Sequence, residues 1–175
     1  MPISMYDATI PMMINMLGNM KAWLDKAATE KGEAALIDAR LIEDMRPLTA
    51  QFQSASDSAK NGAARLAGID MPSMPDTETS FAELKERCDK TIAFLQTITP
   101  EQLEGSENRT VEIRFPSGHG YRFTGLDYAT KFMLPNFFFH VQTAYAILRA
   151  QGVNVGKPDY LAHMGLPNIV PEPAA

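Results

Sequence analysis

The sequence predicts an all-α protein: a four-helix bundle with a small β-hairpin before the last helix. Three observations support this fold class. Long segments repeat apolar residues every three or four positions, which is typical of amphipathic helices. One short segment alternates apolar and polar residues, as a half-buried strand does. The chain has 175 residues, 45 % of them hydrophobic, which suits a single domain over residues 1–175 with a sizeable core.

The first helix is predicted over residues 5–29. Its inward positions form a heptad-like seam of Ile10, Met13, Leu17, Met20 and Leu24. Pro11 lies near the start of this pattern, so the helix either kinks in its first turn or begins at about residue 10. Gly32 follows Lys31 and indicates where the helix stops.

The second helix is predicted over residues 34–67, with Gly68 as its end and Pro47 as a kink inside it. Its inward stripe is bulky in the first half and alanine-rich in the second: Leu41, Met45, Leu48, Phe52, Ala55, Ala59, Ala63 and Leu66. Small residues in the second half either let a neighbouring helix approach closely or leave room for a ligand.

Residues 69–79 are rich in turn and breaker residues and predict a loop. Ser80, with Glu83 three residues later, forms a capping-box pattern that opens the third helix, which should run to about Ile98. The inward positions of this helix are predicted to be Phe81, Leu84, Cys88, Ile92 or Thr91, Leu95 and Ile98.

The hairpin is predicted at about residues 110–124. Val111, Ile113 and Phe115 alternate with polar residues, residues 116–120 form the turn, and 121–124 return. A lone hairpin is only marginally stable in water, so its apolar side should lie on the bundle.

The last helix should open near Leu126 and end at Gly152. It holds the most apolar helical stretch, with an inward stripe of Leu134, Phe137, Val141, Ala144 and Leu148. Pro135 suits a first helical turn or marks a kink. Within the run 137–139, one phenylalanine is expected to pack outside the bundle, against the hairpin or a second subunit. An irregular tail over about 153–175 should pack on the bundle, more loosely from Pro167 onward.

Composition excludes several classes of function. The 16 Lys and Arg residues are scattered and the net charge is −5, so we expect no nucleic-acid partner. No apolar run approaches the roughly 20 residues of a membrane span, and no signal peptide is visible, so we expect no membrane association. A single cysteine, Cys88, allows no disulfide within the chain. These features predict a cytoplasmic protein, and no signature of a cysteine nucleophile surrounds Cys88.

Several stretches together resemble the DinB/YfiT-like four-helix bundles, and more closely the bacterial domain-of-unknown-function family 1993 within that superfamily. They are residues 5–7, 16–19, 64–68, 134–140, 143–145, 147–149, 152, 156–157 and 159–161. The resemblance spans nearly the whole chain. It implies an up-down-down-up bundle that is often a homodimer, and it implies no established activity.

Metal-binding members of the superfamily use three histidines, one on the second helix and two, four residues apart, on the last. His140 matches the second of that pair, whereas the first falls on Asn136 and the second helix has no histidine. We therefore expect no metal and no cofactor. The alternative that the resemblance suggests is a metal-dependent transferase or hydrolase, like the superfamily's thiol-dependent enzymes.

His140 lies at the edge of the apolar stripe and has three interpretations. It is a core histidine satisfied by a hydrogen bond, a polar anchor in a small-molecule pocket, or a metal ligand with Asp57 or Gln53. Asn136, Gln53 and Tyr145 are further candidates for the same pocket, with bundle contacts as the simpler interpretation. His119, in a turn, and His163, in the tail, are expected to be solvated.

The sequence thus favours a dimeric bundle that binds a small molecule near His140, with no catalytic residue assigned. The other hypotheses are the metal-dependent enzyme and a structural or stress-related interaction protein.

Overall fold

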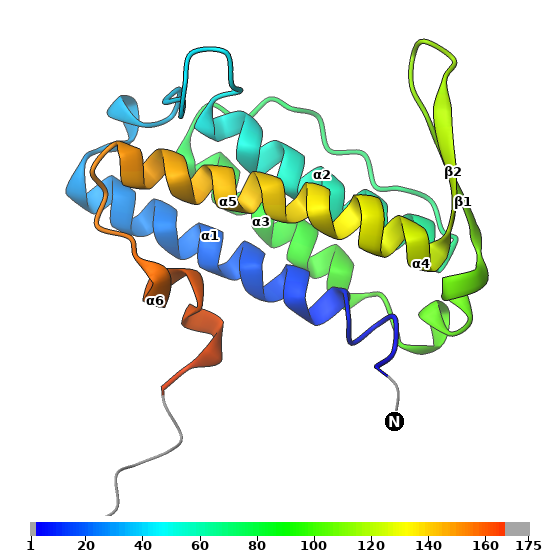
Figure 1. Cartoon of the computed structure of the whole chain (residues 1–175). Coiled ribbons are helices and arrows are strands. Elements are labelled where there is room, and N and C mark those ends of the chain that lie inside the picture. Colours follow the sequence, from blue (N-terminus) through cyan, green and yellow to red (C-terminus); the bar gives the residue numbers. More distant parts are fainter. Residues whose placement is uncertain (1–2, 167–175) are drawn as a thin grey trace, which may run out of the picture.

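The computed structural model describes residues 3–166 and confirms the predicted fold class. Four long helices form the bundle: α1 (Ile10–Glu30), α2 (Leu48–Ala67), α3 (Phe81–Gln96) and α5 (Leu134–Ala150). Each of α1 and α2 packs on both α3 and α5. Residues 68–80 return along the length of the bundle, so α2 and α3 run in the same direction and α1 and α5 run opposite to them (Figure 1). This is the up-down-down-up arrangement.

Helix α1 begins at Ile10, with Pro11 in its first turn, so the second of the two alternatives for Pro11 is confirmed. Before it, the chain turns once: the amide of Ile10 donates to the carbonyl of Tyr6, and Oγ1 of Thr9 donates to the carbonyl of Met5. Proline is tolerated in a first turn because its missing N–H would have no helical partner there. All five residues of the predicted seam are fully buried.

The second helix is shorter than predicted, and the predicted kink at Pro47 is wrong. The segment that follows α1 forms one 3₁₀ turn, Glu33–Ala35, and then a loop that projects from the bundle (Figure 1). Pro47 is the N-cap of α2 with ψ of 171°, so it starts the helix instead of bending it. Proline disfavours a helical conformation in the residue before it, which ends any helix at that point. Leu41 is accordingly 42 % exposed, whereas the stripe from Leu48 onward is buried.

The capping pattern that opens α3 is confirmed in part. Oγ of Ser80 accepts a hydrogen bond from the amide of Glu83 (3.2 Å). The Glu83 carboxylate binds the amide and hydroxyl of Thr79, one residue earlier than a capping box requires. Thr91 is fully buried and Ile92 only partly, so Thr91 is the inward residue at this turn of the helix.

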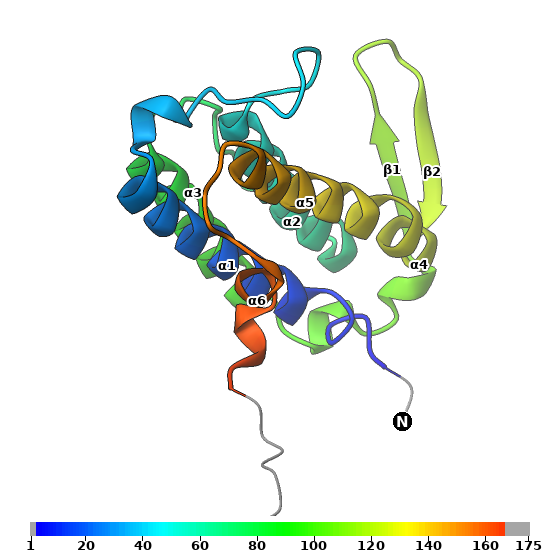
Figure 2. The same cartoon turned by 60° about the vertical axis from the view of Figure 1, so that its left-hand side comes forward.

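The hairpin consists of β1 (Thr110–Arg114) and β2 (Gly120–Thr124), paired antiparallel with Val111 opposite Phe123. Its apolar side faces the last helix near the strand ends, where the Phe123 ring packs on Tyr128. Farther out, Tyr121 is 56 % exposed. The hairpin therefore stands on the bundle at one end only (Figures 1 and 2).

The last helix begins one residue before Leu126 and changes its winding once. A short α4 (Gly125–Tyr128) leads into a π-helical turn, Ala129–Met133, and then into α5, with Pro135 in its first turn. The wide turn lies where a proline would otherwise clash with the preceding turn of an α-helix. It also brings Met133 close to α2, where a Cβ at Gly62 would overlap the Met133 side chain.

The tail packs on α1, but it is partly helical instead of irregular. It forms α6 (Lys157–Tyr160) and a 3₁₀ turn, Ala162–Met164. The ring of Tyr160 stacks on Trp23 at 5.5 Å, and the indole N–H of Trp23 donates to the carbonyl of Asp159 (3.1 Å). The part of the tail from Pro167 onward lies outside the described residues. Among residues 3–166, no helix is both long and apolar enough to cross a membrane.

Candidate functional site

A cleft of about 240 Å³ lies between α2 and α5, with the base of the hairpin at one end. Helix α2 contributes a polar stripe at three- and four-residue steps, the last helix contributes both polar and apolar side chains, and β1 contributes one. The lining residues are Ser54, Asp57, Ser58, Asn61, Arg65, Ile113, Tyr128, Phe132, Met133, Asn136 and His140. The cleft therefore contains two of the predicted site residues, His140 and Asn136.

The imidazole of His140 is held in one orientation by Gln51. Nδ1 of His140 lies 2.8 Å from Oε1 of Gln51, and Nε2 of Gln51 donates to the carbonyl of Arg46 (2.9 Å). Because the amide nitrogen is committed to that carbonyl, Oε1 must face the ring, and an amide oxygen can only accept. The proton of the neutral imidazole is thus on Nδ1, which leaves the lone pair on Nε2.

Burial lowers the pKa of His140, and the nearby charge of Arg46 lowers it further. Both effects disfavour the imidazolium form, so the side chain is neutral at pH 7. A neutral ring with a protonated Nδ1 presents Nε2 as a hydrogen-bond acceptor, a proton acceptor or a ligand atom.

Asn136 is also fixed by its neighbours. Nδ2 of Asn136 donates to Oγ of Ser58 (2.8 Å), and that hydroxyl donates to the carbonyl of Ser54 (2.7 Å). The hydroxyl proton of Ser58 is therefore used, and Ser58 can only accept from Asn136. Oδ1 of Asn136 is left without a protein donor among residues 3–166.

The other two predicted site residues lie elsewhere. Gln53 faces the α2–α3 loop, where its Nε2 donates to Glu78 (2.9 Å). Tyr145 lies on the α1 side of α5, with its ring against Trp23 at 5.7 Å and its hydroxyl 3.5 Å from the carbonyl of Val155. The structure thus does not bring either residue to the cleft of His140, and the glutamine of α2 that contacts His140 is Gln51.

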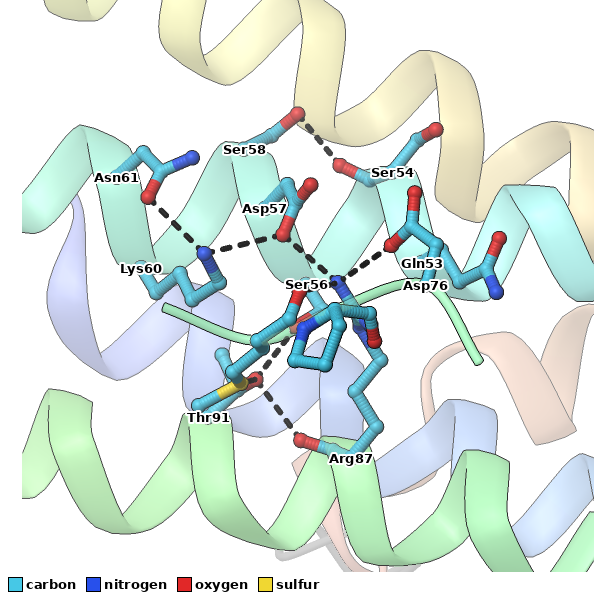
Figure 3. Close-up of polar contacts among 12 residues, drawn as sticks. Gln53, Ser54, Ser56, Asp57, Ser58, Lys60, Asn61, Asp76, Arg87 and Thr91 are labelled. Atoms are coloured by element: carbon cyan, nitrogen blue, oxygen red, sulfur yellow. Dashed lines mark hydrogen bonds and ion pairs between the residues drawn. The ribbon is translucent and has the colours of Figure 1, made fainter. Parts of the chain in front are cut away.

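Behind the cleft, on the α3 side of α2, lies a cluster of charges that the sequence did not predict. Oδ1 of Asp57 binds both Nη2 of Arg87 (2.8 Å) and Nζ of Lys60 (3.1 Å). Figure 3 shows Asp57 between these two cations, with its second oxygen turned away from them. Arg87 also pairs with Asp76 (3.0 Å) and Glu78 (2.8 Å).

Both cations are almost completely buried, with side-chain exposures of 1 % for Arg87 and 5 % for Lys60. Arg87 donates to the carbonyl of Pro75 (3.1 Å) and Lys60 to that of Pro72 (2.9 Å), so they fasten the α2–α3 loop to the bundle. Burial by itself lowers the pKa of Arg87, but its three carboxylates outweigh this and raise it. The role of this cluster is therefore to hold the loop, since buried charges must be paired.

The remaining reactive side chains do not form a second site. Burial raises the pKa of the Cys88 thiol to about 12, so it is inert at neutral pH. His119 is exposed in the hairpin turn, as predicted. His163 is also exposed, but its Nδ1 lies 2.9 Å from Nδ2 of Asn19 and so helps to dock the tail.

Comparison with known proteins decides the family. The family model described as Domain of unknown function (DUF1993) matches residues 5–161. The chain belongs to the DUF1993 family. A crystal structure of a DinB family member protein from Shewanella denitrificans is 36 % identical, with 95 % of each chain covered and a TM-score of 0.83. No curated protein matches this DUF1993 chain.

The metal centre of the wider superfamily can be tested against this DUF1993 chain. Asn136 stands where the first histidine of the pair on the last helix would be, α2 has no histidine, and His140 is the one histidine that lines the cleft. Within residues 3–166, no group of three or more His, Cys, Asp or Glu side chains could hold an ion. Catalytic divalent-metal sites normally have three protein ligands. The donor set therefore does not fit that metal centre.

Proposed function

We propose that this protein binds a small molecule in the cleft between α2 and α5. The observation that carries the proposal is the pair His140 and Asn136. Each is fixed by a protein partner on one side and presents an unused acceptor atom on the other. Convergent polar groups of fixed orientation beside an apolar wall are typical of ligand sites.

The size of the cleft limits the ligand. A volume of about 240 Å³ is below the roughly 300–1,000 Å³ of sites for drug-sized molecules, so the ligand is a small metabolite. A larger hollow of about 620 Å³ lies beside Tyr6 and Leu103. None of the polar side chains that line it is buried, so it offers no comparable set of fixed groups.

The test is a thermal-shift screen of small polar metabolites against the wild type, His140→Ala and His119→Ala. A ligand present at about 100 times its Kd should raise the Tm of the wild type by about 5–10 °C. The shift should disappear in His140→Ala and persist in His119→Ala, which removes an exposed histidine far from the cleft. If no compound stabilises the wild type, or if His140→Ala keeps every shift, the proposal fails.

We also propose that two copies associate through the exposed side of α5. Phe139, next to His140, is 54 % exposed, and Ile42 on the loop before α2 is 61 % exposed. The loop and the hairpin rise on the same side of the bundle, at opposite ends of α5 (Figures 1 and 2). Exposed apolar groups on such a face support a self-association surface.

A cytoplasmic location stays part of the proposal, supported by the single buried thiol of Cys88.

Sedimentation velocity tests the association. The wild type should sediment as a dimer at micromolar concentration, and Phe139→Ser should shift it to the monomer. Leu126→Ser is the matched control, because Leu126 is about equally exposed but lies at the start of the last helix, 13 residues before Phe139. A wild type that remains monomeric at about 100 µM, well above the Kd of a stable dimer, would contradict this proposal.

A further inference from the structure

We propose that the ligand of the cleft is a small zwitterion whose ammonium and carboxylate groups are joined by a short hydrocarbon chain. This inference rests on the proposed function and names the class of ligand. Its basis is the distribution of the hydrogen-bonding groups that are left over after all protein contacts. Apart from the Ser54 hydroxyl, which accepts from Arg46 and can still donate, they are acceptors at one end and donors at the other.

The acceptor end lies beside His140. Nε2 of His140 carries a lone pair, because Gln51 fixes the proton on Nδ1. Oδ1 of Asn136 is unused, because Ser58 takes the amide nitrogen. The Asp57 carboxylate is 38 % exposed and binds Arg87 and Lys60 through Oδ1 alone. Three acceptors in one cleft match the three N–H groups of a primary ammonium.

The charge of Asp57 is not cancelled by the cluster behind it. Arg87 and Lys60 supply two positive charges, while Asp57, Asp76 and Glu78 supply three negative ones. The five groups together therefore carry a net charge of −1, and Arg46, near His140, adds a positive charge at the same end of the cleft. Oδ2 of Asp57, on the cleft side, is where a cationic ligand would meet the negative charge (Figure 3).

The donor end lies nearer the hairpin. Nη1 of Arg65 donates to Oη of Tyr128 (3.3 Å), and Arg65 pairs with no carboxylate among residues 3–166. Burial raises the pKa of Tyr128, so its hydroxyl stays protonated and, having accepted from Arg65, is left to donate. Oδ1 of Asn61 accepts from Lys60 (3.1 Å), which leaves its amide N–H groups. A guanidinium with two neutral donors beside it matches a carboxylate.

The distance between the two ends sets the form of the ligand. Asp57 and Arg65 are eight residues apart on α2, which is about 12 Å along the helix axis. The arginine side chain spans part of that length, so the ligand must still separate its charges by several bonds. Ile113, Phe132 and Met133 form the apolar wall of the cleft and would contact methylene groups. An ω-amino acid has these features, whereas an α-amino acid holds its two charges too close together.

Isothermal titration calorimetry with the full chain tests this inference. The probes are β-alanine, γ-aminobutyrate, δ-aminovalerate and ε-aminocaproate, with butylamine and butyrate as ligands of one charge. One member of the ω-amino acid series should bind at least about tenfold more tightly than either single-charge probe, because charge-assisted hydrogen bonds at both ends add to affinity.

Variants locate the carboxylate. Arg65→Gln should weaken the best ω-amino acid by about tenfold or more and leave butylamine unchanged. Arg149→Gln is the matched control, because Arg149 is an exposed arginine on α5 outside the cleft, and it should change neither. Circular dichroism confirms that each variant is folded.

Two results overturn the inference. The first is that no ω-amino acid binds more tightly than the single-charge probes. The second is that Arg65→Gln affects all probes equally. If the metabolite screen then still yields a ligand that depends on His140, the cleft is a binding site for another chemical class. If the screen yields none, the proposed function has failed as well.

Discussion

Helix α2 has polar groups on both of its flanks, and the two flanks differ in how many of those groups are used. Toward α3, Arg87 and Lys60 are buried and fully engaged with carboxylates and loop carbonyls, apart from Nε of Arg87. Toward α5, the groups around His140 are half-buried, and each has one partner and one unused atom. Asp57 belongs to both flanks.

The difference separates stability from binding. A buried polar group whose partners are all internal contributes to the fold, and removing one partner exposes the others to the full cost of burial. A fixed polar group with unused capacity contributes little to the fold and is available to a ligand. The following predictions test that division.

The largest effect is expected for Arg87→Met. This change leaves Asp76 and Glu78 without their cation and removes the hydrogen bonds from Arg87 to the carbonyls of Pro75 and Met74, so the protein should lose about 3–5 kcal/mol of stability. Lys90→Met, on the exposed side of the same helix, should change stability by no more than about 0.5 kcal/mol. Urea unfolding followed by circular dichroism measures both. Equal effects would remove the distinction between a buried structural cluster and a surface ion pair.

A smaller effect is expected for Gly62→Ala, where α2 and the π-helical turn meet at the edge of the cleft. The new methyl group would overlap the buried side chain of Met133, so we expect a loss of about 1–2 kcal/mol. Gly18→Ala on α1 meets no atom within 4 Å and should instead stabilise the protein by about 0.5–1 kcal/mol. Thermal unfolding gives the sign of each change, and a stabilised Gly62→Ala would mean that the helices are not closely packed there.

The charged cluster should also respond to acid. Burial by itself raises the pKa of Glu78, but the hydrogen bonds from Arg87 and Gln53 outweigh it, so its pKa lies below the usual 4.5. Ionised Glu78 therefore stabilises the fold above about pH 4.5, and this stability is lost as the pH falls through the lowered pKa. Glu78→Gln should cost about 1 kcal/mol at pH 7, since solvent partly screens the pair. The difference in the free energy of unfolding between Glu78→Gln and the wild type should disappear between about pH 5 and 3, as measured by urea titrations. A difference that does not change with pH would show that the charge of Glu78 contributes nothing to stability.

Much of this fold could be predicted from the sequence, because apolar periodicity reports burial directly. The stripe of α2 from Leu48 onward, the N-cap at Ser80 and the inward face of α3 all follow from spacing. The predicted helical course of residues 34–47 was wrong, because Leu41 and Met45 fall on the same period by coincidence. The stronger signal there was Pro47, which fits the start of a helix as well as a kink.

The candidate site was less predictable, because it depends on which neighbour packs on which flank of α2. Gln51 and Gln53 flank buried Phe52 in the sequence, and the spacing of apolar residues does not distinguish between them. Only the arrangement of the bundle directs Gln51 toward α5 and Gln53 toward the loop. Arg87 was missed for a related reason: it precedes inward-facing Cys88, and its acidic partners come from a loop and from another helix. The one available signal was the pair of acids, Asp76 and Glu78, close together near the end of the loop.

The smallest effect on stability, and the sharpest separation of the two flanks, is expected for Asn61→Ala. Asn61 accepts one hydrogen bond from Lys60, which keeps Asp57 and the Pro72 carbonyl as partners without it. Alanine is also a better helix former than asparagine by about 0.5 kcal/mol, so the variant should be as stable as the wild type or slightly more stable. Its amide N–H groups, however, belong to the donor end of the cleft, so a carboxylate ligand should bind several-fold more weakly. A residue whose removal leaves the fold intact and weakens binding is expected where local stability has been exchanged for function. Thermal unfolding and calorimetry on one preparation measure both quantities, and a variant that is destabilised by more than about 1 kcal/mol would place Asn61 with the structural cluster instead.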